Sequence, residues 1–247
     1  MARRNLSCHP GGTAGLALSM LVAVLLGGLP APAAGQSPGP CRPGGLPSGA
    51  RSLICVPASG WNGELVMFAH GYVAPGERLR FAHLRLPDGT ALPDAVQRAG
   101  FAFATTSYRR NGLAVLEGVE DLRELRAAFV AGVGAPHRVL ATGVSEGGLV
   151  VTLLTERHPL EVDGGLSACA PNGGLRRQVD YIGDLRVLFD AFFPGVLPGR
   201  PTTVPRRLAR DWERVYRPRI RAVARRRPDV TQRLLRTADA AVDPRDP

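Results

Sequence analysis

The segment 143–147 reads Gly-Val-Ser-Glu-Gly and offers the clearest chemistry in the sequence. It has the spacing Gly-x-Ser-x-Gly and lies between a strand-like apolar run and a helix-like run at 149–157. A serine on such a turn has an exposed hydroxyl and can act as a nucleophile. Gly143 and Gly147 suit this turn, because a Cβ at either position would strike the adjoining strand or helix. The alternative is an ordinary connection in which Ser145 caps the helix.

Strand-like and helix-like runs alternate through the middle of the chain. Strand patterns occupy residues 52–56, 64–69, 101–107, 138–142 and 164–168, and helix patterns occupy 92–99, 114–129 and 149–157. This alternation predicts an α/β fold, a mostly parallel sheet with right-handed crossovers and flanking helices. In the 114–129 helix, Asp121, Glu124 and Arg126 are expected on the solvent side.

The character of the sequence changes after Gly174. Helical patterns broken by prolines cover residues 180–193 and 204–227, and no convincing strand follows. We therefore expect four regions: a signal peptide at 1–35, a flexible leader at 36–50, a partial α/β core at 51–174 and a helical lid or cap segment at 175–247.

A second motif supports a specific resemblance. Residues 68–72 read Phe-Ala-His-Gly-Tyr and follow a buried strand pattern. Together with the segment 143–147, they resemble the α/β-hydrolase superfamily, specifically its secreted bacterial serine hydrolases, over about residues 64–174. The resemblance implies that Ser145 attacks an acyl carbonyl, and that the backbone N–H groups of Glu146 and Tyr72 bind the oxyanion.

The resemblance also gives roles to the residues around this site. Gly71 lets the backbone approach the substrate closely, His70 makes structural hydrogen bonds, and Gly143 and Gly147 support the turn. Glu146 contributes its amide, and its carboxylate has no role.

The histidine that should activate the serine is not identified. In the superfamily it follows the serine and an acidic residue in the sequence. His158 lies thirteen residues after Ser145 on the same predicted helix, roughly 20 Å away at 1.5 Å per residue, so it fits a helix C-terminus. His137 precedes the strand at its opposite end. His83 lies in a loop and could approach the site, but it comes before the serine.

The acidic partner is equally open. Asp163 opens the strand after the helix at its wrong end, whereas Asp180 and Asp184 also fit the start of a lid helix. We therefore expect the chain to be a fragment, a truncated product or a frameshifted reading that stops inside the lid.

The N-terminal sequence predicts export. Arg3 and Arg4 precede an apolar run at 16–29, and Ala-Pro-Ala follows at 31–33 as a cleavage site, so the mature protein should be secreted or periplasmic. No other run is long enough to span a bilayer. In an oxidising compartment Cys41 and Cys55 could form a disulfide, which the sequence leaves open.

Composition gives little support for binding to nucleic acid. The net charge is +10, yet all basic residues are arginine, which indicates compositional bias rather than an anionic partner. Trp212 and Tyr216 are expected to pack inward, and Cys169 is expected to be a buried free thiol. We expect no nucleic acid; a weaker hypothesis is a membrane- or polyanion-surface binder that uses the arginine-rich tail.

The leading hypothesis is a secreted serine hydrolase that acts on an acyl substrate, a carboxylic ester, through an acyl-enzyme on Ser145. A prolyl-oligopeptidase-like peptidase and a non-catalytic remnant are the alternatives. No cofactor or metal is expected, because the sequence has no phosphate loop, dinucleotide fingerprint or metal-ligand spacing. Arg109 and Arg110 could meet an anionic substrate, although a solvated loop fits them better. The substrate is a small molecule or a peptide, and the oligomeric state is left open.

Overall fold

The structure of the protein is a computed structural model that describes residues 37–240 and Val242. The described residues divide into two compact units, one ending at Asn172 and one that includes residues 173–240. The predicted signal peptide at 1–35 lies outside the described residues.

A mixed sheet of six strands forms the first unit. The strands are β1 (Cys41–Gly45), β2 (Arg51–Cys55), β3 (Glu64–Ala69), β4 (Ala102–Thr106), β5 (Arg138–Val144) and β6 (Gly164–Ala168), in the order β1-β2-β4-β3-β5-β6. Neighbouring strands from β4 to β6 are parallel, whereas β1 and β2 pair antiparallel at one edge. The predicted α/β fold with a mostly parallel sheet is therefore confirmed.

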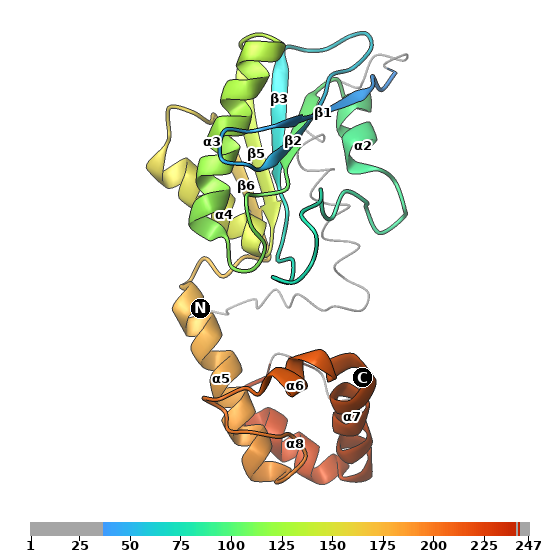
Figure 1. The fold of residues 1–247 in the computed structure, drawn as a ribbon, viewed down its shortest axis with the longest axis vertical. Helices are drawn as coiled ribbons and strands as arrows, with labels where there is room; N and C mark the ends of the chain where they lie inside the picture. Colours follow the sequence, from blue (N-terminus) through green and yellow to red (C-terminus); the bar gives the residue numbers. More distant parts are fainter. Residues whose placement is uncertain (1–36, 241, 243–247) are drawn as a thin grey trace, which may run out of the picture. The chain divides into compact units, whose positions relative to one another are not determined.

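Three helices cover the two faces of the sheet. Helices α3 (Val115–Gly132) and α4 (Glu146–Arg157) pack side by side on one face, and α2 (Leu92–Arg98) lies on the other (Figure 1). Right-handed crossovers require this distribution. The chain steps from β3 to β4 in one direction, but from β4 through β5 to β6 in the opposite direction, so the crossover helices change face.

The central strands carry the buried apolar residues. Strand β3 reads Glu-Leu-Val-Met-Phe-Ala, and all of its residues except Glu64 are buried. It pairs in parallel with β4 and β5, and Ala69 lies opposite Gly143 at its carboxyl end. The two loops that follow β3 and β5 therefore leave the sheet at the same edge, where ligands of open α/β sheets bind.

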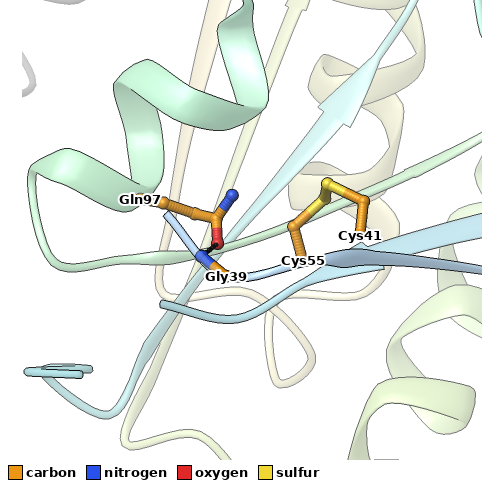
Figure 2. The surroundings of a disulfide bond; sticks show 4 residues. All are labelled: Gly39, Cys41, Cys55 and Gln97. Carbon is orange, nitrogen blue, oxygen red and sulfur yellow. Dashed lines mark hydrogen bonds between the residues drawn. A yellow bond between two sulfur atoms is a disulfide. The ribbon is translucent and has the colours of Figure 1, made fainter. Parts of the chain in front are cut away.

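The N-terminal edge differs from the flexible leader predicted for residues 36–50. Cys41–Gly45 form strand β1, and a disulfide joins Cys41 to Cys55 on β2 (Figure 2). The backbone N–H of Gly39 also donates a 2.9 Å hydrogen bond to Oε1 of Gln97 on α2. A covalent link and strand pairing order this part of the segment, which its Pro- and Gly-rich composition did not indicate.

Two further expectations for this unit were wrong. Asp121 is fully buried rather than solvated, because both of its carboxylate oxygens accept hydrogen bonds from Arg109. Cys169 is exposed and disulfide-bonded rather than a buried free thiol. For Asp121, the environment is determined by Arg109, which lies outside helix α3.

The second unit is helical over its described residues. It contains α5 (Leu175–Phe192), α6 (Arg206–Arg210), the π-helical turn η1 (Trp212–Tyr216), α7 (Arg217–Arg226) and α8 (Pro228–Thr237). A separate apolar core holds it together, formed by Phe189, Phe193, Val196, Val230 and Leu234. Trp212 is 38% exposed, so the expectation that it packs inward was wrong. The lid role of this segment stays a prediction.

Within the described part of the chain, no helix combines the length and hydrophobicity needed to cross a bilayer.

Candidate functional site

Ser145 lies at a sharp turn between β5 and α4. Its backbone has φ 57° and ψ −122°, a left-handed conformation that few residues other than glycine adopt. The sheet compensates for this strain: the Ser145 N–H donates a 2.9 Å hydrogen bond to the carbonyl of Ala168, at the end of β6. Ser145 precedes α4, yet its side chain makes no capping hydrogen bond. The alternative interpretation, a serine that caps the helix, is therefore wrong.

The two glycines around Ser145 allow strand, turn and helix to pack closely. A Cβ on Gly147 would lie 2.0 Å from the carbonyl oxygen of Ala69 and 2.6 Å from that of His70. A Cβ on Gly143 would lie 2.3 Å from the carbonyl oxygen of Gly147. Both contacts are with backbone, which cannot move aside as a flexible side chain can. The turn therefore requires glycine at both positions, as the sequence predicted.

The loop after β3 lies directly against this turn. A Cβ built on Gly71 would lie 3.2 Å from the carbonyl oxygen of Val144 and 3.6 Å from the Cβ of Ser145. Neither the Tyr72 N–H nor the Glu146 N–H is hydrogen-bonded to another described residue. The Glu146 amide is also the first of helix α4, where the aligned peptide dipoles favour negative charge. These two N–H groups are thus free to bind an oxyanion.

No protein-family model matches the chain, and no curated protein matches it. Among solved structures, an esterase from Pyrococcus furiosus is 15% identical, with a TM-score of 0.44 over 64% of this chain and 57% of that chain. Brefeldin A esterase, a bacterial homologue of human hormone-sensitive lipase, is 18% identical, with a TM-score of 0.40 over 74% and 57%. A prolyl endopeptidase is 16% identical, with a TM-score of 0.37 over 53% and 20%.

The chain therefore spans little more than half the length of these esterases. Its own topology is more informative: a mostly parallel sheet leads through a strained serine into a helix, and a His-Gly loop lies beside that turn. The fold is α/β-hydrolase-like.

In this α/β-hydrolase-like fold, Ser145 opens onto a pocket of about 370 Å³. The residues that line the pocket include the apolar Phe68, Leu92 and Val144, and the others are Gly71, Tyr72, His83, Arg85 and Ser145. This size and lining are typical of small-molecule sites, in which apolar walls hold the ligand and a few polar groups orient it.

His70 has the environment of a structural histidine. It is 2% exposed, and its Nδ1 lies 2.7 Å from the carbonyl oxygen of Gly71. Its ring stacks on Tyr108 at 4.0 Å between centroids, and the Tyr108 hydroxyl donates a hydrogen bond to the His70 carbonyl. Burial lowers the pKa of His70, which favours the neutral imidazole. These contacts fix the loop that carries Gly71 and Tyr72.

The carboxylate of Glu146 has a role that sequence reasoning missed. It is buried, and its Oε1 accepts a 2.6 Å hydrogen bond from the N–H of Ala114, immediately before α3. Burial raises the pKa of this carboxyl group. Glu146 therefore ties the serine turn to the start of a helix distant in sequence. The only signal in the sequence was an acidic residue directly after the serine.

Other sequence candidates lie away from the serine or are already paired. The backbone N–H of His137 bonds to Gly63, and His158 follows the end of α4. Arg109 is paired with buried Asp121, and Arg110 is paired with Glu117, so a contact of either with an anionic substrate stays a prediction.

The acid candidates are also accounted for. Asp163 accepts a hydrogen bond from the Val139 N–H at the start of β5, the end opposite Ser145. Asp180 and Asp184 are exposed on α5 in the second unit. Among the residues that the structure describes, no cluster of three His, Cys, Asp or Glu side chains is arranged to hold a metal.

Proposed function

We propose that this protein is a serine hydrolase that cleaves a carboxylic ester through an acyl-enzyme on Ser145. The main support is the strained turn. Ser145 has φ 57°, directly precedes α4 and lines a pocket. The unpaired N–H groups of Glu146 and Tyr72 supply the oxyanion contacts, which in such enzymes are worth about 3 kcal/mol each.

The pocket favours an ester with an apolar acyl group. Phe68, Leu92 and Val144 offer apolar surface in the same pocket as Ser145. An acyl chain seated there would place its carbonyl carbon at the serine hydroxyl and its carbonyl oxygen toward the free amides. We also propose that the protein works outside the cytoplasm, because the Cys41–Cys55 disulfide suits an oxidising compartment.

A fluorophosphonate probe tests this function, because it labels only serines that are activated. The natural chain should be labelled, and Ser145→Ala should abolish labelling while the protein stays folded by circular dichroism. Ser59→Ala is the matched control, since Ser59 is exposed in the turn after β2. A folded natural chain that is not labelled would contradict the proposal and favour the non-catalytic remnant.

Matched substrates then separate ester from amide cleavage. A p-nitrophenyl ester and a p-nitroanilide that carry the same apolar acyl group should differ, with hydrolysis of the ester alone. Hydrolysis of a prolyl p-nitroanilide would instead favour the peptidase alternative.

A further inference from the structure

The positive charge of the protein is concentrated in its second unit. Over the described residues of the first unit, 37–172, twelve arginines are balanced by twelve acidic residues. Residues 173–240 contain sixteen arginines and only seven acidic residues. A compositional bias explains why every basic residue is arginine, but it would act on both units alike. The excess in the second unit therefore needs a local explanation.

This excess is greatest along one continuous helical segment. The turn η1 runs directly into α7, and residues 214–228 contain seven arginines and no acidic residue. One side of the segment packs inward, since Ile220 and Val223 contact the apolar core of the second unit. Its exposed side carries Arg219, Arg221, Arg225 and Arg226, which we call the basic face.

The basic face has no acidic partner among the described residues, whereas Arg217 at the start of α7 is paired with Glu213. Arg219 donates a 3.4 Å hydrogen bond to the carbonyl oxygen of Gly195, and the other three guanidinium groups bond to no described residue. Arg221 and Arg225 are four residues apart, and like charges at this spacing repel on a helix. This repulsion destabilises the helix, and an anionic partner would relieve it.

Exposed apolar side chains accompany these arginines. Trp212 is 38% exposed and Val215 is 46% exposed, both in the turn that leads into α7. Val215 and Arg219 are four residues apart, so they lie on the same side of the helical segment. The boundary between lipid headgroups and acyl chains accommodates tryptophan, valine and arginine together, whereas the phosphates of a nucleic acid give an exposed valine no apolar environment. The combination favours a lipid surface.

We propose that the helical segment 212–226 binds the surface of a bilayer that contains anionic phospholipids. The guanidinium groups of the basic face donate hydrogen bonds to the headgroup phosphates, and Trp212 and Val215 enter the boundary between headgroups and acyl chains. Each arginine near such a surface strengthens binding about fivefold, so the four together contribute on the order of 10²- to 10³-fold. The pocket at Ser145 takes no part, so this binding does not depend on the proposed ester hydrolysis.

Vesicle co-sedimentation tests this proposal. The natural chain should bind vesicles made of equal parts phosphatidylcholine and phosphatidylglycerol, and should bind pure phosphatidylcholine vesicles much more weakly. Added salt should weaken the binding, because counterions screen the headgroup charge. The triple variant Arg221→Gln, Arg225→Gln and Arg226→Gln should bind the anionic vesicles about 10²-fold more weakly. Glutamine is a good helix former, so α7 should persist in this variant, as circular dichroism can verify.

A matched variant separates the basic face from the total charge. Arg42→Gln, Arg78→Gln and Arg98→Gln together remove the same charge from exposed positions of the first unit. This control should bind the anionic vesicles like the natural chain. Equal losses in the two triple variants, or equal binding of the natural chain to anionic and neutral vesicles, would overturn the proposal.

Tryptophan emission and DNA binding distinguish a bilayer from other polyanions. The emission of the natural chain should shift to shorter wavelength on binding anionic vesicles. Trp212→Phe should lose this shift, because Trp61 is then the only tryptophan in the sequence. Vesicle binding without the shift would overturn the insertion of Trp212 into the bilayer boundary. Binding to a DNA duplex without binding to the vesicles would overturn the proposal in favour of a nucleic-acid surface.

Discussion

The side chain of Glu146 and the backbone N–H of Ala114 form a 2.6 Å hydrogen bond that joins two elements 32 residues apart. Glu146 follows the candidate nucleophile, and Ala114 precedes helix α3. The position of the serine turn therefore depends on a buried carboxylate as well as on the strand that precedes it.

Removing this carboxylate should weaken the fold. Glu146→Ala leaves the Ala114 N–H buried without an acceptor, which costs about 1–3 kcal/mol. Urea denaturation should show this loss, and the ester hydrolysis rate should fall with it because the turn relaxes. Glu146→Gln keeps an oxygen acceptor and should lose less. Equal stability of Glu146→Ala and the natural chain would show that the hydrogen bond contributes nothing.

The pH dependence of stability should report the same residue. Burial raises the folded-state pKa of Glu146 above its ordinary 4.5, so the folded state binds the proton more tightly than the unfolded state. The contribution of Glu146 to stability therefore falls as pH rises from about 4.5 through the raised pKa. Glu146→Gln cannot titrate, so its stability relative to the natural chain should increase over that interval. If the difference in stability between Glu146→Gln and the natural chain stays constant with pH, the pKa of Glu146 is not raised by folding.

Gly147 should tolerate no side chain. The methyl group of Gly147→Ala would overlap the backbone carbonyls of Ala69 and His70 at 2.0 and 2.6 Å. We expect destabilisation of about 3 kcal/mol or more and loss of fluorophosphonate labelling. Gly132→Ala, where a Cβ meets nothing within 4 Å, is the control and should keep both stability and labelling. A stable and labelled Gly147→Ala variant would be inconsistent with the turn geometry.

The buried carboxylate of Asp121 should matter more than an exposed ion pair. Asp121 is fully buried and accepts hydrogen bonds from both the backbone N–H and the Nε of Arg109. Asp121→Ala should cost about 2–3 kcal/mol in thermal or urea unfolding, because these donors lose their acceptor. Glu117→Ala breaks the more exposed pair with Arg110 and should cost about 0.5 kcal/mol or less. If the two variants lost similar free energies of unfolding, the buried carboxylate would be no more important than the exposed ion pair.

The disulfide should stabilise the N-terminal edge of the sheet. Cys41 and Cys55 close a loop with a sequence separation of 14 residues. The double variant Cys41→Ser and Cys55→Ser should lose about 3 kcal/mol, the value expected for a loop of this length. Ester hydrolysis should persist under conditions where the variant remains folded. Unchanged resistance to urea would show that strand pairing alone orders β1.

The sequence alone determined the parts that depend on local backbone. The spacing Gly143-x-Ser145-x-Gly147 demanded a tight turn, and alternating apolar runs demanded a parallel sheet with crossover helices. These features are encoded within a few residues, because strand periodicity and the need for glycine are local steric properties. The strand at Glu64–Ala69 was predicted to the residue for the same reason.

Only the tertiary structure decided which distant residues meet. His83 lies near Ser145, although the two residues belong to different loops. Glu146 accepts a hydrogen bond from Ala114, and buried Asp121 accepts one from Arg109. No shared periodicity in the sequence connects these pairs. The same is true of β1. Its composition predicted a flexible leader, but in the structure it pairs with β2. Such contacts depend on how segments far apart in the sequence come together in the fold. A local pattern of residue types does not predict them.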